Sequence, residues 1–289
     1  MHSNARERRL YWRRLIADRL ATAAAALAAL AVMAPLIAIF VYLVARGAGA
    51  LSWSFLTHAP APVGETGGGI GNALVGSGLI LATGSVIGIP FGIGAGIYLA
   101  EYGRGRLSTV VRFTADVLNG VPSIVMGIAV YSLVVIRQKH FSALAGGVAI
   151  GIMMVPTVAR TTEEMLLMVP RSIREAALGL GISEWRTVLS VTLRTALPGV
   201  ITGVMLAFAR VAGETAPLLF TAFGNQFWSL NLNQPIAALP LQIYSYAISP
   251  YEEWHQQAWA GALVLIVVIV GTVAVVRLVA GRGVMKGAA

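Results

Sequence analysis

Residues 171–217 read RSIREAALGLGISEWRTVLSVTLRTALPGVITGVMLAFARVAGETAP, and this stretch decides how the chain is organised. Its first half is polar, helix-prone and rich in small residues, whereas its second half is apolar over the length of a membrane span. The apolar half nevertheless carries an arginine, Arg210, and a glutamate one helical turn later, Glu214. A solvated helix followed by charges inside a membrane span indicates a device that couples a cytoplasmic partner to a path for a charged solute.

The composition of the whole chain indicates an integral membrane protein. Of its 289 residues, 57% are hydrophobic and 11% are charged, and the mean hydropathy is +0.78. Most of the charge-free runs reach the roughly 20 residues that a helix needs to cross a bilayer, which predicts an all-α fold with six transmembrane helices. We place these helices at residues 21–45, 70–100, 113–136, 141–161, 195–222 and 256–280.

The chain begins with a basic segment, HSNARERRLYWRR, directly before the first apolar run. A cleaved signal peptide is one interpretation of such a start. The apolar run is too long for a signal peptide and no small-residue cleavage site follows promptly, so we expect an uncleaved first helix instead. This helix is rich in alanine and leucine and nearly featureless, which predicts a place at the edge of the bundle.

Arginine and lysine are distributed unevenly among the segments between the apolar runs. If the N-terminus lies in the cytoplasm, most of the 21 basic residues fall on the cytoplasmic side. The net charge of +9 therefore indicates topology and attraction to anionic membrane lipid, and not a nucleic-acid surface. We expect a cytoplasmic N-terminus at residues 1–20, a membrane domain at residues 21–280 and a cytoplasmic tail at residues 281–289. Within the membrane domain we expect one long cytoplasmic loop at residues 171–194 and one long outer loop at residues 223–255.

Several enzyme chemistries find no support in the sequence. The chain has no cysteine, so thiol catalysis and thiolate metal sites are excluded. Neither lysine follows a glycine, so no nucleotide-binding P-loop is present, and no HExxH motif occurs. We therefore expect a chain that is not an enzyme and that binds no cofactor of its own.

Charged residues inside the membrane are the first functional candidates, because each costs roughly 2.5–3.5 kcal/mol near a helix centre. Arg210 lies near the middle of the fifth predicted helix, and Glu214 follows on the same face, where the two can pair. They could form a structural pair that neutralises itself. Alternatively, the Arg210 guanidinium could bind an oxyanion, with Glu214 pairing it while the path is empty or accepting a proton from the anion.

Two further charged pairs lie at helix ends. Arg160 and Glu163 are three residues apart where the fourth predicted helix reaches the cytoplasm, and either an interfacial anchor or a place at the inner mouth of a path would explain them. Asp116 follows Arg112 by four residues in the third predicted helix, which favours a structural pair between them.

Glycine and proline residues predict close packing of the second predicted helix and a break in the third. Four glycines recur every four residues on one face of the second predicted helix, so another helix can approach closely there. The segment DVLNGVPSIVMG should interrupt the third predicted helix and expose backbone to a cavity. The glycines are Gly84, Gly88, Gly92 and Gly96, and the interrupting residues are Asn119, Gly120, Pro122 and Ser123.

The segment EAALGLGISEW resembles the EAA loop of the permease subunits of bacterial ABC importers. In that family a short helix of alanines, followed by glycine, docks into a cleft of the ATPase. Four residues here match its start, namely Glu175, Ala176, Ala177 and Gly181. Arg194 stands where the loop usually has proline, a departure that suits one branch of the family.

That branch is the phosphate-specific importers, and the resemblance is closest to their PstA-type permease subunit. The segments ARVAGETAPLLFTAFGNQFWS and RFTADVLNGVPSIVMGIAVYSLVV carry it, within a resemblance that spans about residues 66–270. It implies a type I ABC importer permease fold in a bacterial inner membrane. It also implies four kinds of partner: a PstC-type permease subunit, two copies of a PstB-type ATPase that bind ATP and Mg, an extracytoplasmic phosphate-binding protein, and membrane lipid. The residues implicated in phosphate passage correspond to Arg160, Glu163 and Arg210.

The predicted outer loop, residues 223–255, is long, nearly uncharged and rich in aromatic residues, including Phe227 and Trp228. Docking of a binding protein would explain these aromatic residues, and so would an aromatic belt at the bilayer surface.

Two rival functions stay open on the residues alone. A permease for sulfate, molybdate or phosphonate would use the same charge pattern, and only the family resemblance favours phosphate. A channel or secondary transporter would need no ATPase, but it would also have no use for the EAA-like helix.

Overall fold

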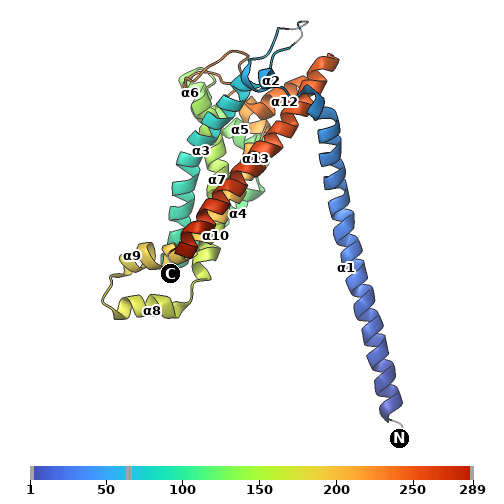
Figure 1. The fold of residues 1–289 in the computed structure, drawn as a ribbon. Helices are drawn as coiled ribbons and strands as arrows, with labels where there is room; N and C mark the ends of the chain where they lie inside the picture. Colours follow the sequence, from blue (N-terminus) through green and yellow to red (C-terminus); the bar gives the residue numbers. More distant parts are fainter. Residues whose placement is uncertain (1–2, 63–64, 66, 287–289) are drawn as a thin grey trace.

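The protein is a bundle of long helices that run in alternating directions (Figure 1). The computed structural model describes residues 3–62, 65 and 67–286. In this part of the chain five helices are long and apolar enough to cross a membrane, or six when one sharply bent pair counts as a single span. Their main elements are α1 Ser3–Gly47, α3 Gly71–Ile97, α7 Ala143–Leu167, α10 Leu193–Ala212 and α13 Glu252–Lys286, and the span that holds α10 begins already at Glu184. The bent pair consists of α4 Arg106–Gly120 and the run Ser123–Gln138, which begins with α5 Ser123–Val130. The predicted all-α membrane fold is confirmed.

Short helices connect the long ones at both ends of the bundle. α8 and α9 lie at the same end as the start of α1 and the end of α13, whereas α2, α6 and α12 lie at the opposite end (Figure 1). Helix α13 continues into the predicted tail, residues 281–289, of which the last three lie outside the described residues. The short helices are α2 Trp53–Thr57, α6 Ile136–Gln138, α8 Arg171–Gly179, α9 Glu184–Arg186, α11 Ala216–Leu219 and α12 Leu239–Ala247.

The glycine stripe of α3 packs against α7, as its period predicts. Cβ atoms on Gly88 and Gly92 would lie 2.6 Å from the Cβ atoms of Met154 and Val158, so only glycine permits this approach. The spacing of these contacts shows that α3 and α7 run side by side in the same direction. The stripe therefore serves packing within this chain.

The third predicted helix, residues 113–136, is not one straight helix. It is split into α4 and the run Ser123–Gln138 that begins with α5, and the two parts are bent by 106° relative to each other. The reason is local: Val121 precedes Pro122 and adopts an extended conformation, because the proline ring disfavours the helical conformation in the preceding residue. The interruption was predicted, but its size was not.

The fifth predicted helix, residues 195–222, is also shorter than expected. Helix α10 ends at Ala212, and the chain turns through Gly213 before the four-residue helix α11 begins. Pro217 at the start of α11 is buried against α5, where a Cβ on Gly127 would lie 2.6 Å from the Pro217 Cα atom. The two broken spans therefore meet each other.

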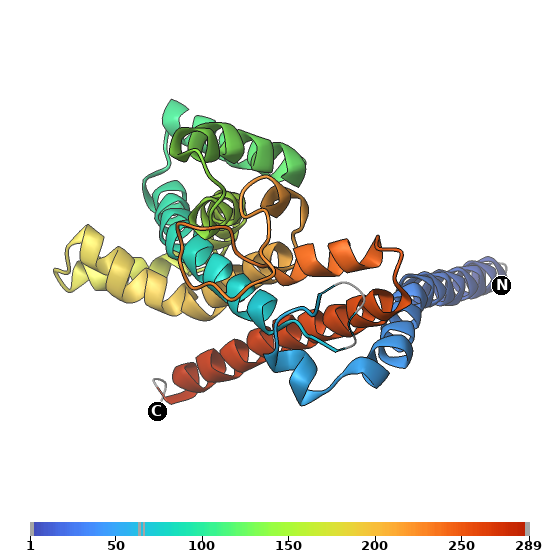
Figure 2. The ribbon, with the colours of Figure 1, turned by 90° about the horizontal axis from the view of Figure 1, so that it is seen from above.

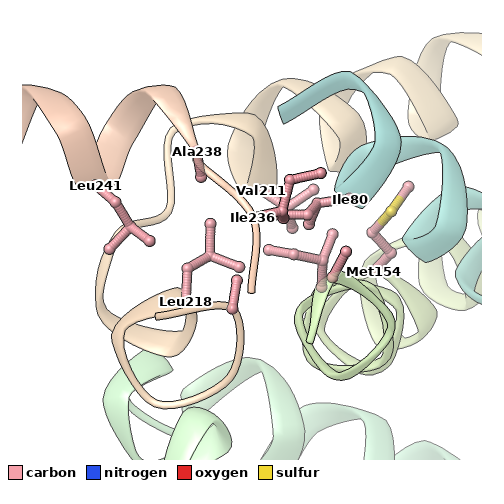
Figure 3. Close-up of a cluster of buried hydrophobic side chains, with 10 residues drawn as sticks. Ile80, Met154, Val211, Leu218, Ile236, Ala238 and Leu241 are labelled. Atoms are coloured by element: carbon pink, nitrogen blue, oxygen red, sulfur yellow. The ribbon is translucent and has the colours of Figure 1, made fainter. Parts of the chain in front are cut away.

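The centre of the core lies where α10 ends. Apolar side chains from α3, α7, α10, α11 and α12 converge there, together with the segment that leads from α11 to α12 (Figure 3). Because these side chains are buried on several elements at once, the cluster holds the break in a defined geometry. Its labelled members are Ile80, Met154, Val211, Leu218, Ile236, Ala238 and Leu241.

Helix α1 stands apart from the bundle over most of its length (Figures 1 and 2). It contacts α13 near its C-terminal end, where Leu43 is buried and the rings of Tyr42 and Trp259 meet edge to face at 5.2 Å. Nearly all side chains described from residue 8 to residue 42 are exposed. The predicted peripheral position of the first helix is confirmed.

Candidate functional site

Arg210 lies near the C-terminal end of α10 and faces away from the core of its own chain. Its side chain is exposed, whereas the next two residues, Val211 and Ala212, are buried. The local reason is helical geometry, since neighbouring residues along a helix point in different directions. A bare arginine in lipid at this depth costs roughly 2.5–3.5 kcal/mol, so this face calls for a water-filled path or another protein chain against it.

The predicted pair of Arg210 and Glu214 is wrong. Helix α10 ends before Glu214, so the two residues are not on adjacent turns of one helix. The Glu214 backbone N–H donates to the Val211 carbonyl at 3.1 Å, and no ion pair between these two side chains occurs in the described part of the chain. The idea of a self-neutralising structural pair therefore has no geometric basis.

Glu163 of α7 is the most deeply buried charge of the candidate site. Only 3% of the residue is exposed, and its two carboxylate oxygens accept from different arginines. Oε1 accepts from Arg112 Nε at 2.7 Å and Oε2 accepts from an Arg160 terminal nitrogen at 3.3 Å. Arg160 also lies 3.4 Å from Glu164, and its side chain stays 45% exposed. Arg160 is thus held by two carboxylates while remaining accessible.

The predicted pair of Arg112 and Asp116 is also wrong. α4 packs beside α7, so Arg112 reaches across to Glu163, and Asp116 is left exposed. No local pattern in the sequence links positions 112 and 163. The same interface carries a hydrogen bond at 3.1 Å from the Thr157 hydroxyl to the side-chain oxygen of Asn119, next to the break in the third span.

Arg160 and Arg210 occupy different depths of the bundle. α7 and α10 run antiparallel, and Gly203 lies directly against Thr161. This register places Arg210 at the depth of Met154, which is further from the α8 end than Arg160 is. At the rise of an α-helix, the two arginines are roughly 9 Å apart along the bundle. The two arginines therefore lie at two successive depths of the bundle and not at one level.

The predicted EAA-like segment forms α8 and the turn after it. Glu175 and Ala176 are exposed, whereas Ala177 is buried. Gly181 has a φ of +79°, a conformation that favours glycine. The Ile182 N–H donates to the Ala177 carbonyl at 3.2 Å and the Gly181 N–H donates to the Leu178 carbonyl at 2.9 Å, which is the Schellman pattern that ends a helix.

An exposed apolar cluster next to this turn escaped the sequence analysis. Leu178, Leu180 and Trp185 are 44%, 82% and 57% exposed. Leu178 and Leu180 lie outside the candidate membrane spans, and Trp185 lies at the very start of the span Glu184–Ala212. Lipid therefore does not explain the two leucines, and exposed apolar groups of this kind favour a protein contact. The available signal was the presence of large apolar residues within an otherwise polar loop.

The helix α8 is tied to the bundle by a second ion pair that the sequence did not indicate. Arg174 donates to the carboxylate of Glu101 at 2.8 Å and to the Leu166 carbonyl at 2.7 Å. The two side chains are 20% and 12% exposed. The pair joins residues that are far apart in the sequence, and only the packing of α8 under α3 and α7 brings them together.

Two features of this helical membrane protein are thus exposed on its surface: Arg210 near the end of α10, and the apolar residues beside the turn at Gly181. Residues 88–282 match the family described as "Binding-protein-dependent transport system inner membrane component". The chain belongs to this family and, within it, to the PstA permeases.

The relatives are similar over most of their length. The chain is 50% identical over 223 residues to a protein of Yersinia pestis named "Phosphate transport system permease protein PstA", which covers 77% of this chain and 76% of the relative. It is 36% identical over 283 residues to "Phosphate transport system permease protein PstA 1" of Mycobacterium tuberculosis, covering 95% of this chain and 92% of the relative.

One similar solved structure supports the fold. A chain of the MetNI methionine ABC transporter in an inward-facing conformation superposes with a TM-score of 0.55. The two sequences are 19% identical, and the match covers 75% of this chain and 96% of that chain. The predicted type I ABC importer permease fold is confirmed.

Proposed function

We propose that this chain is a permease subunit of an ATP-driven importer of inorganic phosphate. It lines half of a translocation path in a bacterial inner membrane, with both of its termini in the cytoplasm. The names of its relatives support the substrate, and the uneven distribution of basic residues supports the orientation.

The exposure of Arg210 on the surface of this subunit is the observation that carries this proposal. A guanidinium presents a fixed fork of donors that matches two oxygens of a phosphate group. Because Arg210 has no carboxylate partner among the described residues, its donors are available to an anion. Arg160, which is half exposed and lies nearer to α8, provides the next positive position toward the cytoplasm.

Two subunits are required because Arg210 lies on the surface of this one. A second permease subunit of the PstC type would cover that face and complete the path. The aromatic residues Phe227 and Trp228, 78% and 52% exposed in the outer loop, would contribute to the docking of an extracytoplasmic phosphate-binding protein.

The energy source would be a dimer of a PstB-type ATPase, which would bind ATP and Mg, whereas this chain binds no cofactor and catalyses no reaction. The turn at Gly181, with Glu175, Ala176 and the exposed Leu180, supplies the surface that such an ATPase would grip. It lies at the same end of the bundle as the start of α1 and the end of α13 (Figure 1), so this surface would face the cytoplasm if both termini do.

The decisive experiment measures ATP-dependent uptake of labelled phosphate into vesicles that contain this chain with its partner subunits. Excess unlabelled sulfate, molybdate or phosphonate serves as competitor. Uptake that requires ATP and resists all three competitors supports the proposal. Competition by one of them assigns the chain to that oxyanion. Uptake without ATP, or without a bound ATPase, refutes the proposal that the chain belongs to an ATP-driven importer.

A further inference from the structure

We propose that a chain of polar contacts transmits movement of α8 to Arg160, and that Arg174, Glu101 and Arg112 are positioning residues for transport. We name it the coupling relay, and it consists of Arg174, Glu101, Leu99, Arg112, Glu163 and Arg160. The proposal deepens the proposed function, since it says how the ATPase surface and the anion path are joined.

The first link of the coupling relay joins α8 to the end of α3. Arg174 donates to Glu101 at 2.8 Å and to the Leu166 carbonyl of α7 at 2.7 Å. One planar guanidinium therefore contacts two membrane helices, in a place that is largely shielded from water. Movement of α8 must either carry Glu101 along or break both contacts.

The second link passes through a π-helical turn. Glu101 and Leu99 both belong to the turn Tyr98–Tyr102, which follows α3 directly. The Leu99 carbonyl accepts from an Arg112 terminal nitrogen at 3.1 Å. π-Helical turns interrupt the regular helical register and occur frequently at functional sites. A displacement of Glu101 is therefore passed to Arg112 through one turn of backbone.

The third link ends at the anion path. Arg112 uses its Nε atom to hold Glu163 at 2.7 Å, and the other oxygen of Glu163 holds Arg160 at 3.3 Å. Glu163 is 3% exposed, so few other partners are open to it. If Arg112 moves, Glu163 must either move with it or lose its contact with Arg112. Either event changes how firmly Glu163 holds Arg160.

Space for movement lies beside the first link. A cavity of about 440 Å³ lies beside this contact, and it is lined by Glu101, Arg174, Leu178, Thr187 and Thr192 among others. Three buried polar atoms here have no partner among the described residues: Arg174 Nε and the hydroxyls of Thr187 and Thr192. Unsatisfied buried groups favour a rearrangement that pairs them, so a shift of α8 into this space would be stabilised if it gave these atoms partners.

The test uses the complete transporter in vesicles and compares two rates, ATP hydrolysis and anion uptake. Arg174→Gln and Glu101→Gln each remove one side of the first link, and the double variant removes both. Arg171→Gln is the matched control, because Arg171 is an exposed residue of the same helix. Arg112→Gln removes the link to Glu163 without touching α8.

If the coupling relay operates, the number of anions taken up per ATP hydrolysed falls about tenfold in Arg174→Gln and Glu101→Gln, with the ATPase still bound, and stays within about twofold of wild type in Arg171→Gln. This ratio is no lower in the double variant than in either single variant. Combining Arg112→Gln with Arg174→Gln lowers the ratio no further than Arg174→Gln alone. Arg174→Lys keeps the charge and recovers part of the ratio.

Two results would overturn the coupling relay. A normal ratio in both single variants would show that the contacts carry no movement, and loss of the ATPase from both would show that they serve assembly alone. These failures are distinct from failure of the proposed function. Absence of phosphate uptake by the wild-type complex would refute the substrate, whereas the ratio can be measured with whichever oxyanion that complex transports.

Discussion

Arg112 in α4 donates to the carboxylate of Glu163 in α7 at 2.7 Å, although Asp116 is the carboxylate nearest to it along its own helix. This contact ties the broken third span to the fourth span beside Arg160. It also makes Glu163 a buried charge with two arginine partners, so its energetics can be tested apart from transport.

Arg112→Gln is expected to destabilise the subunit by roughly 1–3 kcal/mol, since it leaves the buried Glu163 with one partner instead of two. The midpoint of thermal unfolding in detergent should fall. Neutralising Glu163 as well should recover most of the loss, because the buried charge is then gone. Asp116→Asn is the control and should leave the midpoint unchanged.

Arg210→Gln should reduce phosphate uptake to background while the ATPase still co-purifies with the subunit. The substitution removes the charge but keeps a side chain of similar length that can form hydrogen bonds. Since Glu214 is not paired with Arg210, adding Glu214→Gln should not restore uptake. Transport regained by the double variant would contradict the anion-site role of Arg210.

Gly181→Asp should abolish ATP-driven uptake while the subunit stays inserted in the membrane. The residue at 181 must adopt a φ of +79°, which aspartate and asparagine both tolerate better than most L-residues, so the effect of aspartate comes mainly from the charge that it adds next to the exposed Leu180. Gly181→Asn should be milder, because it adds a side chain of the same size without the charge. Normal uptake by the aspartate variant would argue against a docking role for the turn.

Gly92→Ala should destabilise the bundle, whereas Gly94→Ala should not. A Cβ on Gly92 would lie 2.6 Å from Val158, but a Cβ on Gly94 meets nothing within 4 Å. Overpacking of this kind costs roughly 1–3 kcal/mol. The two variants, compared by thermal unfolding in detergent, separate the packing of the stripe from general effects of alanine in a membrane helix. Equal midpoints would mean that α3 and α7 are not in close contact.

Single cysteines should report the topology directly, since the chain has none of its own. A cysteine at Ser229 or at the exposed Asn233 should react with an impermeant thiol reagent added to intact cells, and one at the exposed Ser183 should not. Labelling at 183 from outside would place α8 and α9 on the outer face and remove the basis for ATPase docking.

The sequence by itself determined the features that depend on local pattern. The length of each apolar run predicted the spans, and the four-residue glycine period predicted the packed face of α3, because a helix places such residues on one side wherever it lies. Pro122 marked the break in the third span. The segment around Glu175 to Gly181 marked α8 and the turn after it, since this helix end depends on neighbouring residues alone.

Only the tertiary structure decided which charges meet. Local spacing favoured Arg210 with Glu214 and Arg112 with Asp116, and both pairings are wrong. α10 ends at Ala212 and α11 packs its Pro217 against Gly127 of another span, whereas Arg112 pairs with Glu163 because α4 lies against α7. Arg174 and Glu101 meet for the same reason. A buried charge takes the partner that the packing of distant helices brings within reach, and a single sequence carries no direct signal for that choice.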